Sequence, residues 1–238
     1  MFATASLVAL LSLAKISDNA LPREKPEFSN HKNQSHMILA DIKAIFTVIR
    51  GVEAIVKHNP TMWETLSSSP YSPAMIGHRV QYHQAQDFGL PVEIQSRYNM
   101  LRVDCLESLL PDDEPDNKRA CLDAISWLEI VHRELLYRAS ASSLINSDDT
   151  LEREWEPEPD HLVKWFALVS SDFVSMLQKD SPAALVILGE FFGLLRLLES
   201  RWFLKNVSNN TLAAIKEIID PRGLAFLLVK TKAAGNKS

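Results

Sequence analysis

SPAALVILGEFFGLLRLLESRWFL, from Ser181 to Leu204, is the stretch that decides the fold of this chain. One helical face of it carries six large apolar residues, and the face behind it is also largely apolar. The first face comprises Leu185, Leu188, Phe192, Leu195, Leu198 and Trp202, and the second comprises Val186, Gly189, Gly193 and Leu197. A helix that is apolar on nearly every side is buried by its neighbours. The stretch therefore predicts the central helix of a bundle.

Two glycines interrupt the apolar surface of this helix. Gly189 and Gly193 lie four residues apart, so they remove side chains from one strip. A strip without side chains lets another backbone come close, and it gives the same access to a flat ligand. Close packing between helices is sufficient to explain the pair, and a ligand site remains the alternative.

The apolar run does not have the length of a membrane span. From Pro182 to Leu195 it has 14 residues, whereas a span needs about 20. Glu190 lies in its middle, and an ionisable side chain inside a membrane is costly. We expect a core helix and no membrane span.

The first residues, MFATASLVALLSLAK, have the apolar length of a signal peptide, with Ser12-Leu13-Ala14 as a candidate cleavage site. Glycosylation sequons start at Asn33, Asn206 and Asn209, as a secreted protein could carry. However, no Lys or Arg precedes Lys15, so the charged leader is missing. We interpret the segment as a core helix, with secretion as the alternative.

Apolar residues recur at spacings of three and four along most of the chain, which is typical of amphipathic helices. The stripes are Ile38, Ile42, Ile45, Ile49, Val52 and Val56; then Ile94, Tyr98, Leu101, Cys105 and Leu109; then Leu122, Ile125, Leu128, Val131 and Leu135. Glycine is scarce, at seven residues, and no run alternates as a strand does. The pattern predicts an all-α fold.

Two further helices are expected towards the C-terminus. Asp160 is a candidate N-cap for a helix reaching Leu177, and Asn209 or Asn210 for a helix that ends at Pro221. The first of these helices would bury Leu162, Phe166, Val169, Phe173 and Met176.

Polar segments separate the predicted helices. They are a loop from Leu21 to Ser35, a turn-rich break from Ser67 to Pro73, an acidic break from Leu110 to Asn117, and an acidic loop at about 146–160. The helices before and after the acidic loop each have an apolar face, and they can bury these faces by packing against one another. We therefore expect residues 1–238 to form one domain, a helical bundle with a buried central helix and a flexible tail at about 232–238.

Composition restricts the chemistry. The formal net charge is −5, and no long basic run offers a nucleic-acid surface. The two cysteines, Cys105 and Cys121, lie among apolar residues, so we expect buried thiols and no metal site. HExxH, GxSxG, CxxC and phosphate-binding glycine loops are all absent from the sequence. His31 and His36, five residues apart, do not share a helix face as metal ligands would. We expect no cofactor, and catalytic residues remain unassigned.

Aromatic residues concentrate in the last third of the chain. They are Trp165, Phe166, Phe173, Phe191, Phe192, Trp202 and Phe203. This density suits an apolar cavity, the usual kind of small-molecule site, although core packing uses the same residues. We expect the cavity between the helices at 162–177 and 181–204. Its candidate ligand-binding residues are Gly189, Phe192, Gly193, Leu195 and Trp202, and its ligand a flat hydrophobe.

The region from Leu162 to Asn206 resembles the C-terminal regulatory domain of fungal zinc-binuclear-cluster transcription factors of the sterol-uptake-regulator type. That family has a Pro-x-Ala-Leu-x-Ile-Leu-Ala helix, a Leu-Leu pair and a Trp-Trp element. The matching residues are Pro182, Ala184, Leu185, Ile187, Leu188, Leu194, Leu195 and Trp202, and the departures are Gly189 and Phe203. FTVIRGVEAIV, from Phe46 to Val56, resembles the family's Leu-x-Arg-Gly-Val segment, and the first fifteen residues resemble the helix before it. The resemblance runs from Phe2 to about Asp220.

The resemblance implies an all-helical module that senses a hydrophobic ligand, a sterol in the sterol regulators, and that tends to dimerise. We therefore expect the ligand to be a sterol or a flat molecule of the terpenoid or polyketide type. Members of the sterol-regulator type move to the nucleus when sterol falls, so the resemblance implies a nuclear or cytoplasmic protein. Two cysteines cannot form the family's six-cysteine DNA-binding cluster, so we expect no direct DNA binding. Two other functions remain open. One is an enzyme that cyclises a hydrophobic intermediate by confinement and orientation, which needs no sequence motif. The other is a helical interaction scaffold.

Overall fold

The computed structural model describes residues 12–16, 31–57, 88–107, 109–110, 115–145, 165–198 and 204–222. Within these ranges the chain is helical and has no strand, so the predicted all-α fold is confirmed. The longer helices are α2 (His31–Lys57), α5 (Val92–Glu107), α6 (Pro115–Ile145), α8 (Ser171–Gln178), α9 (Pro182–Leu194) and α10 (Val207–Ile219). Two short 3₁₀ helices, η1 (Leu195–Leu198) and η2 (Asp220–Arg222), extend α9 and α10.

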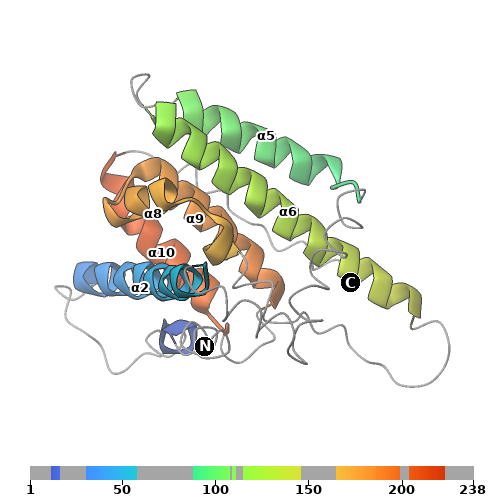
Figure 1. The fold of residues 1–238 in the computed structure, drawn as a ribbon, viewed down its shortest axis with the longest axis horizontal. Coiled ribbons are helices and arrows are strands. Elements are labelled where there is room, and N and C mark those ends of the chain that lie inside the picture. The colour runs from blue at the N-terminus through green and yellow to red at the C-terminus, as the bar shows by residue number, and fades with distance from the viewer. Residues whose placement is uncertain are drawn as a thin grey trace.

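The helices pack in a sequence of layers (Figure 1). α5 lies along α6, and α6 packs on α8 and α9. On its other side α9 packs on α10, which in turn lies against α2. α9 is therefore central, and every residue from Ala183 to Leu194 is buried. This confirms the predicted buried central helix. The α-helix ends at Leu194, however, and gives way to η1 at Leu195, so it does not continue unbroken to Leu204.

The turn between α8 and α9 sets the angle of 104° between α8 and the helical segment Pro182–Leu198. Asp180 adopts a left-handed conformation, with φ of 54°. The Ser181 amide donates to the Met176 carbonyl at 3.0 Å, and the Asp180 amide donates to the Leu177 carbonyl at 3.1 Å. This pair of bonds is the Schellman closure of a helix end. Pro182 then begins α9 at a position that suits proline, because the first helical amide needs no partner there.

Several predicted boundaries are wrong. α2 begins at His31, so the last five residues of the predicted loop from Leu21 to Ser35 are helical. α6 begins at Pro115, inside the predicted acidic break. α10 has its N-cap at Asn206, and neither Asn209 nor Asn210 caps it. Its helical end at Ile219, followed by η2, agrees with the predicted end near Pro221.

The helix predicted to reach Leu177 is broken. Residues 165–168 are helical, and α8 starts only after Ser170, whose hydroxyl accepts a bond from the Phe173 amide at 3.2 Å. A serine N-cap favours the start of a new helix at this position. The helix therefore breaks here, although the apolar spacing continues without interruption. Phe166, Val169, Phe173 and Met176 are nevertheless buried as predicted.

The predicted stripes form the core. Ile38, Ile42, Ile45 and Ile49 are buried on α2, as are Ile125, Leu128, Val131 and Leu135 on α6, and Tyr98 and Leu101 on α5. Ile94, Leu109 and Leu122 are half-buried. Leu13 and Ile16 of the N-terminal segment belong to the same core, as expected of a core helix. Cys121 is a free, buried thiol, and burial raises its pKa to about 12.

Some predictions concern parts of the chain that lie outside the described residues. These are Trp202, Phe203, Leu162, the Cys105 side chain, the break at 67–73, the acidic loop at 146–160 and the tail at 232–238. Among the helices that the structure describes, none is by itself both long and apolar enough to cross a membrane; α8 and the segment Pro182–Leu198 pass that criterion only as a bent pair.

Candidate functional site

The structure brings four of the five predicted ligand-binding residues onto one buried segment. Gly189, Phe192 and Gly193 lie on α9, and Leu195 begins η1. Phe192 is 0% exposed and Leu195 1% exposed. The fifth residue, Trp202, is outside the described residues. These positions share the burial that a ligand site and a packed core both require.

The aromatic residues beside α9 contact one another. The Trp165 indole stacks on Phe191, with ring centroids 4.4 Å apart and an interplanar angle of 15°. Phe166 meets Phe191 edge to face at 5.0 Å, and Phe46 of α2 meets Phe166 in the same way at 4.7 Å. The indole nitrogen of Trp165 donates to the Ala124 carbonyl at 3.1 Å. These are favourable ring geometries, and they tie α2, α6 and α9 together. The cavity predicted beside them stays a prediction.

A buried ion pair joins α5 to the middle of α9. The Glu190 carboxylate, in a residue only 8% exposed, pairs with the guanidinium of Arg97, whose side chain is 28% exposed. Burial raises the pKa of Glu190, and the charge and hydrogen bond of Arg97 partly offset that rise. Glu190 was visible in the sequence as an ionisable residue inside an apolar run. Arg97 carried no such signal, because only the packing of α5 brings it to Glu190.

A second polar contact lies next to this ion pair. The Tyr98 hydroxyl is 2.9 Å from His132 Nδ1 on α6. Burial raises the pKa of Tyr98 well above its usual value, and the charge of Glu190 adds to the rise. Burial, followed by the charge of Arg97, lowers the pKa of His132 to about 4. Both groups are therefore neutral near pH 7, and the imidazole tautomer sets which of them donates.

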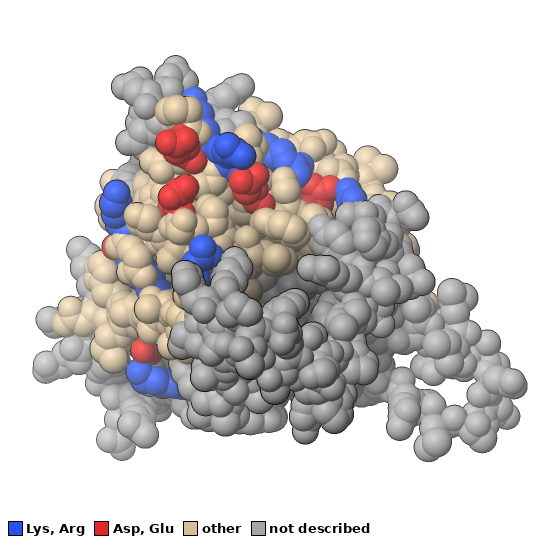
Figure 2. Space-filling view, in the orientation of Figure 1, with Lys and Arg blue, Asp and Glu red and all other residues tan. Residues whose placement is uncertain are grey.

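Glu129 of α6 completes this polar cluster, which we define as Arg97, Tyr98, Glu129, His132 and Glu190. Its carboxylate, in a residue 7% exposed, accepts bonds from Arg102 and Arg133. Figure 2 shows basic and acidic side chains interspersed over the upper part of the view, where α5 and α6 lie in Figure 1. The surface over α5 and α6 thus carries charges of both signs.

Chemically, the polar cluster combines a carboxylate, a guanidinium, a phenol and an imidazole beside an apolar helix. A few polar groups that converge next to apolar surface are typical of small-molecule sites, and shifted pKa values are enriched there. Structural ion pairs between helices produce similar shifts. Within the described ranges, no group of three or more His, Cys, Asp or Glu side chains is placed to hold a metal ion.

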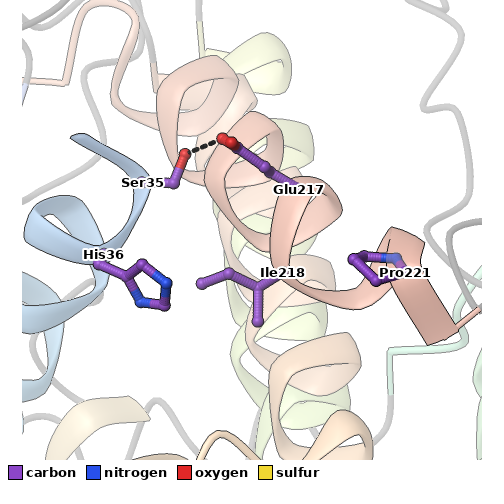
Figure 3. A pocket seen from close by; sticks show the side chains of 5 residues that line it. All are labelled: Ser35, His36, Glu217, Ile218 and Pro221. Atoms are coloured by element: carbon purple, nitrogen blue, oxygen red, sulfur yellow. Dashed lines mark hydrogen bonds between the residues drawn. The ribbon is translucent and has the colours of Figure 1, made fainter. Parts of the chain in front are cut away.

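A surface notch of about 180 Å³ lies between the start of α2 and the end of α10. It is lined by Ser35, His36, Glu217, Ile218 and Pro221 (Figure 3). The Ser35 hydroxyl donates directly to the Glu217 carboxylate, and the His36 ring lies on the side of Ile218. A serine nucleophile needs the histidine between itself and the acid. The notch therefore lacks the arrangement of a hydrolase triad.

Comparison with known proteins identifies no relative of this chain. No family model, no curated protein and no solved structure matches it.

Proposed function

We propose that this chain is a regulatory module of the fungal transcription-factor type, which binds a sterol-like hydrophobic molecule against α9. The observation that carries the proposal is α9 itself, a central helix that is buried on every side and apolar except for Glu190. The positions that resemble the fungal family, including Pro182, Leu185 and Leu188, belong to this helix. A regulator needs a ligand site in its core, and a buried helix with two glycines and one carboxylate supplies apolar area together with polar orientation.

Under this proposal the protein acts in the nucleus or the cytoplasm, forms a homodimer, and does not itself contact DNA. The six-cysteine cluster that would bind DNA is absent from residues 1–238, which contain two cysteines. Contact with a promoter then belongs to a partner protein. The ligand is held mainly by buried apolar area, at about 25 cal/mol per Å².

The test uses dehydroergosterol, a fluorescent sterol that accepts energy from tryptophan. Trp165 is fully buried and stacks on Phe191 of α9, so it reports directly on a sterol bound beside this helix. Saturable energy transfer is expected with the unmodified chain. Gly193→Leu should abolish it and leave the helical circular dichroism unchanged, because the added side chain occupies the strip that the ligand uses.

Gly51→Leu provides the matched control. Gly51 is exposed on α2, and a Cβ atom there meets nothing within 4 Å, so this variant should bind as the unmodified chain does. Loss of helical signal in Gly193→Leu alone would show that the glycine serves helix packing, against a ligand site at this position. Absence of transfer with the unmodified chain would contradict the proposal and favour an interaction scaffold.

The polar cluster favours a second candidate, an enzyme that folds a reactive hydrophobic intermediate against α9 and closes a ring. Confinement and orientation supply much of such catalysis, and the Tyr98–His132 and Arg97–Glu190 pairs provide polar groups for it. A biosynthetic gene cluster beside the gene would favour this enzyme. An upstream exon that encodes six cysteines would favour the regulator.

A further inference from the structure

Two hydroxyl groups on α10 lie in the core without a partner. Ser208 and Thr211 are both 0% exposed, and the structure gives neither Ser208 Oγ nor Thr211 Oγ1 a hydrogen-bond partner among the described residues. Buried hydroxyls are almost always hydrogen-bonded, because an unpaired one loses its bonds to water and gains none in the protein. Two such groups on one helix call for a binding partner that supplies the missing bonds.

The contacts of α10 show where these hydroxyls point. Glu217 bonds to Ser35 of α2, and Asn210 bonds to the carbonyl of Ile16. Asn209, the exposed neighbour of Asn210, bonds to Arg196 of η1. At 100° per residue, Thr211 and Ser208 each lie about 100–160° around the helix from these two asparagines, on the buried side of α10. They therefore face the interior between α2 and α9, the helix of the proposed ligand site.

The spacing of the two residues lets a single atom serve both. Side chains three residues apart on a helix lie with their Cβ atoms about 5–6 Å apart. One oxygen placed between them can accept from one hydroxyl and donate to the other. A carboxylate would be less suitable, because the rest of this buried side is apolar and offers no positive charge: its other buried residues are Val207, Ala214, Ile215 and Ile219. The chemistry fits a neutral hydroxyl group carried by a hydrophobic molecule.

One residue that lines the notch of Figure 3, Ile218, lies on the same side of α10 as Thr211. Ile218, in its lining, is seven residues beyond Thr211, which is two helical turns and about 10 Å along the axis. Two turns bring Ile218 back to nearly the angular position of Thr211. α10 packs on α2 and α9 along this face. An elongated hydrophobe that entered by the notch would therefore have to displace part of this packing to bring its far end to the two hydroxyls.

We propose that Ser208 and Thr211 anchor the hydroxyl group of the ligand, which is a hydrophobic alcohol such as a sterol with a free 3-hydroxyl. This inference rests on the proposed function and narrows its ligand class. Apolar contacts along α9 and α10 hold the ring system, and the two side chains select for the alcohol over the corresponding hydrocarbon.

The experiment measures how ergosterol and 3-deoxyergosterol displace dehydroergosterol from the full chain. The unmodified protein should bind ergosterol at least about tenfold more tightly than 3-deoxyergosterol. The deoxy compound would leave the two buried hydroxyls of the protein unpaired, and such a loss weakens binding strongly. The double variant Ser208→Ala with Thr211→Val, which keeps side-chain volume nearly constant, should bind the two compounds equally. Thr211→Ser, which retains the hydroxyl, should keep most of the preference.

The matched control is Ser126→Ala with Thr47→Val. Both hydroxyls are exposed and bond to carbonyls of their own helices, those of Leu122 and Lys43, so the tenfold preference should persist. Equal binding of the two compounds by the unmodified protein would overturn the anchor and leave the proposed function standing. A double variant that keeps the preference would also overturn it, and a higher melting temperature of that variant would show that the two hydroxyls are simply unpaired in the core. No binding of either compound would overturn the anchor and the proposed function together.

Discussion

Removal of Arg97 should expose the cost of Glu190 inside α9. Arg97→Met keeps the length of the aliphatic stem and deletes the guanidinium that pairs with the Glu190 carboxylate. Loss of one partner of a buried ion pair costs about 3–5 kcal/mol of folding free energy. Arg97 is 28% exposed, so water already weakens the pair. We therefore expect a loss of about 3 kcal/mol at pH 7.

The loss should shrink as the pH falls. Burial already raises the pKa of Glu190, and without Arg97 nothing in the ion pair offsets that rise. A carboxyl whose folded pKa lies above its unfolded value stabilises the fold at low pH and destabilises it as the pH rises through the folded pKa. Between the unfolded pKa and the folded pKa of this carboxyl, each pH unit changes the free energy of unfolding by up to about 1.4 kcal/mol. At pH 5 the variant should therefore be within about 1 kcal/mol of the unmodified protein.

Urea denaturation at pH 7 and pH 5 measures this effect. The double variant Arg97→Met with Glu190→Met should regain most of the stability at pH 7, because a buried ion pair replaced by apolar groups of similar size is often neutral. Lys15→Met is the control, since the Lys15–Asp41 pair is exposed on the lysine side and should contribute less than about 1 kcal/mol. An equal loss for Arg97→Met at the two pH values, or no loss at either, would refute the reasoning.

Two further predictions concern the core and the buried imidazole. Leu188→Ala should lower the free energy of unfolding by about 2–5 kcal/mol in urea denaturation, because Leu188 is 1% exposed on α9. Leu197→Ala is the control: Leu197 is 54% exposed, so the change should be less than about 0.5 kcal/mol. Equal effects of the two substitutions would contradict the placement of α9. His132 should make the fold less stable as the pH falls from its usual pKa of 6.5 towards about 4, because only the unfolded chain binds the proton in that window. His132→Gln should flatten the curve of stability against pH there by roughly 2–4 kcal/mol, and an unchanged curve would show that His132 titrates normally.

Helical periodicity was enough to predict the class of the fold and most of its core. The stripe from Ile38 to Ile49 and the apolar run of α9 are buried as expected, because the sides that a helix buries follow from spacing alone. The break at Ser170 was missed, since a side-chain bond to the Phe173 amide begins a new helix within an unbroken apolar pattern. The start of α2 was missed because its first residues, His31 to Gln34, are polar, and a run of polar residues looks like a loop.

The polar groups of the site were harder to predict than its apolar ones. Glu190 was conspicuous in the sequence, but Arg97 approaches it from 93 positions earlier in the chain (190 minus 97), through the packing of α5. Ser208 and Thr211 share the apolar side of α10, a pattern visible in the sequence, yet small hydroxylated residues on such a side are common. Their significance comes from complete burial without a bond, which only coordinates can show.

Glu190 also bears on the choice between a ligand-binding module and a scaffold. A scaffold with a filled core is at least as stable with an apolar residue in the middle of α9, since a buried ion pair seldom repays the desolvation of its charges. A ligand-binding module would have a use for the pair, because it connects α5 to the helix of the proposed ligand site. The double variant of Arg97 and Glu190 separates these two cases when sterol binding is measured on it. Stability near that of the unmodified protein together with lost energy transfer from Trp165 would assign the pair to the ligand site. Retained binding would leave the pair with a purely structural role.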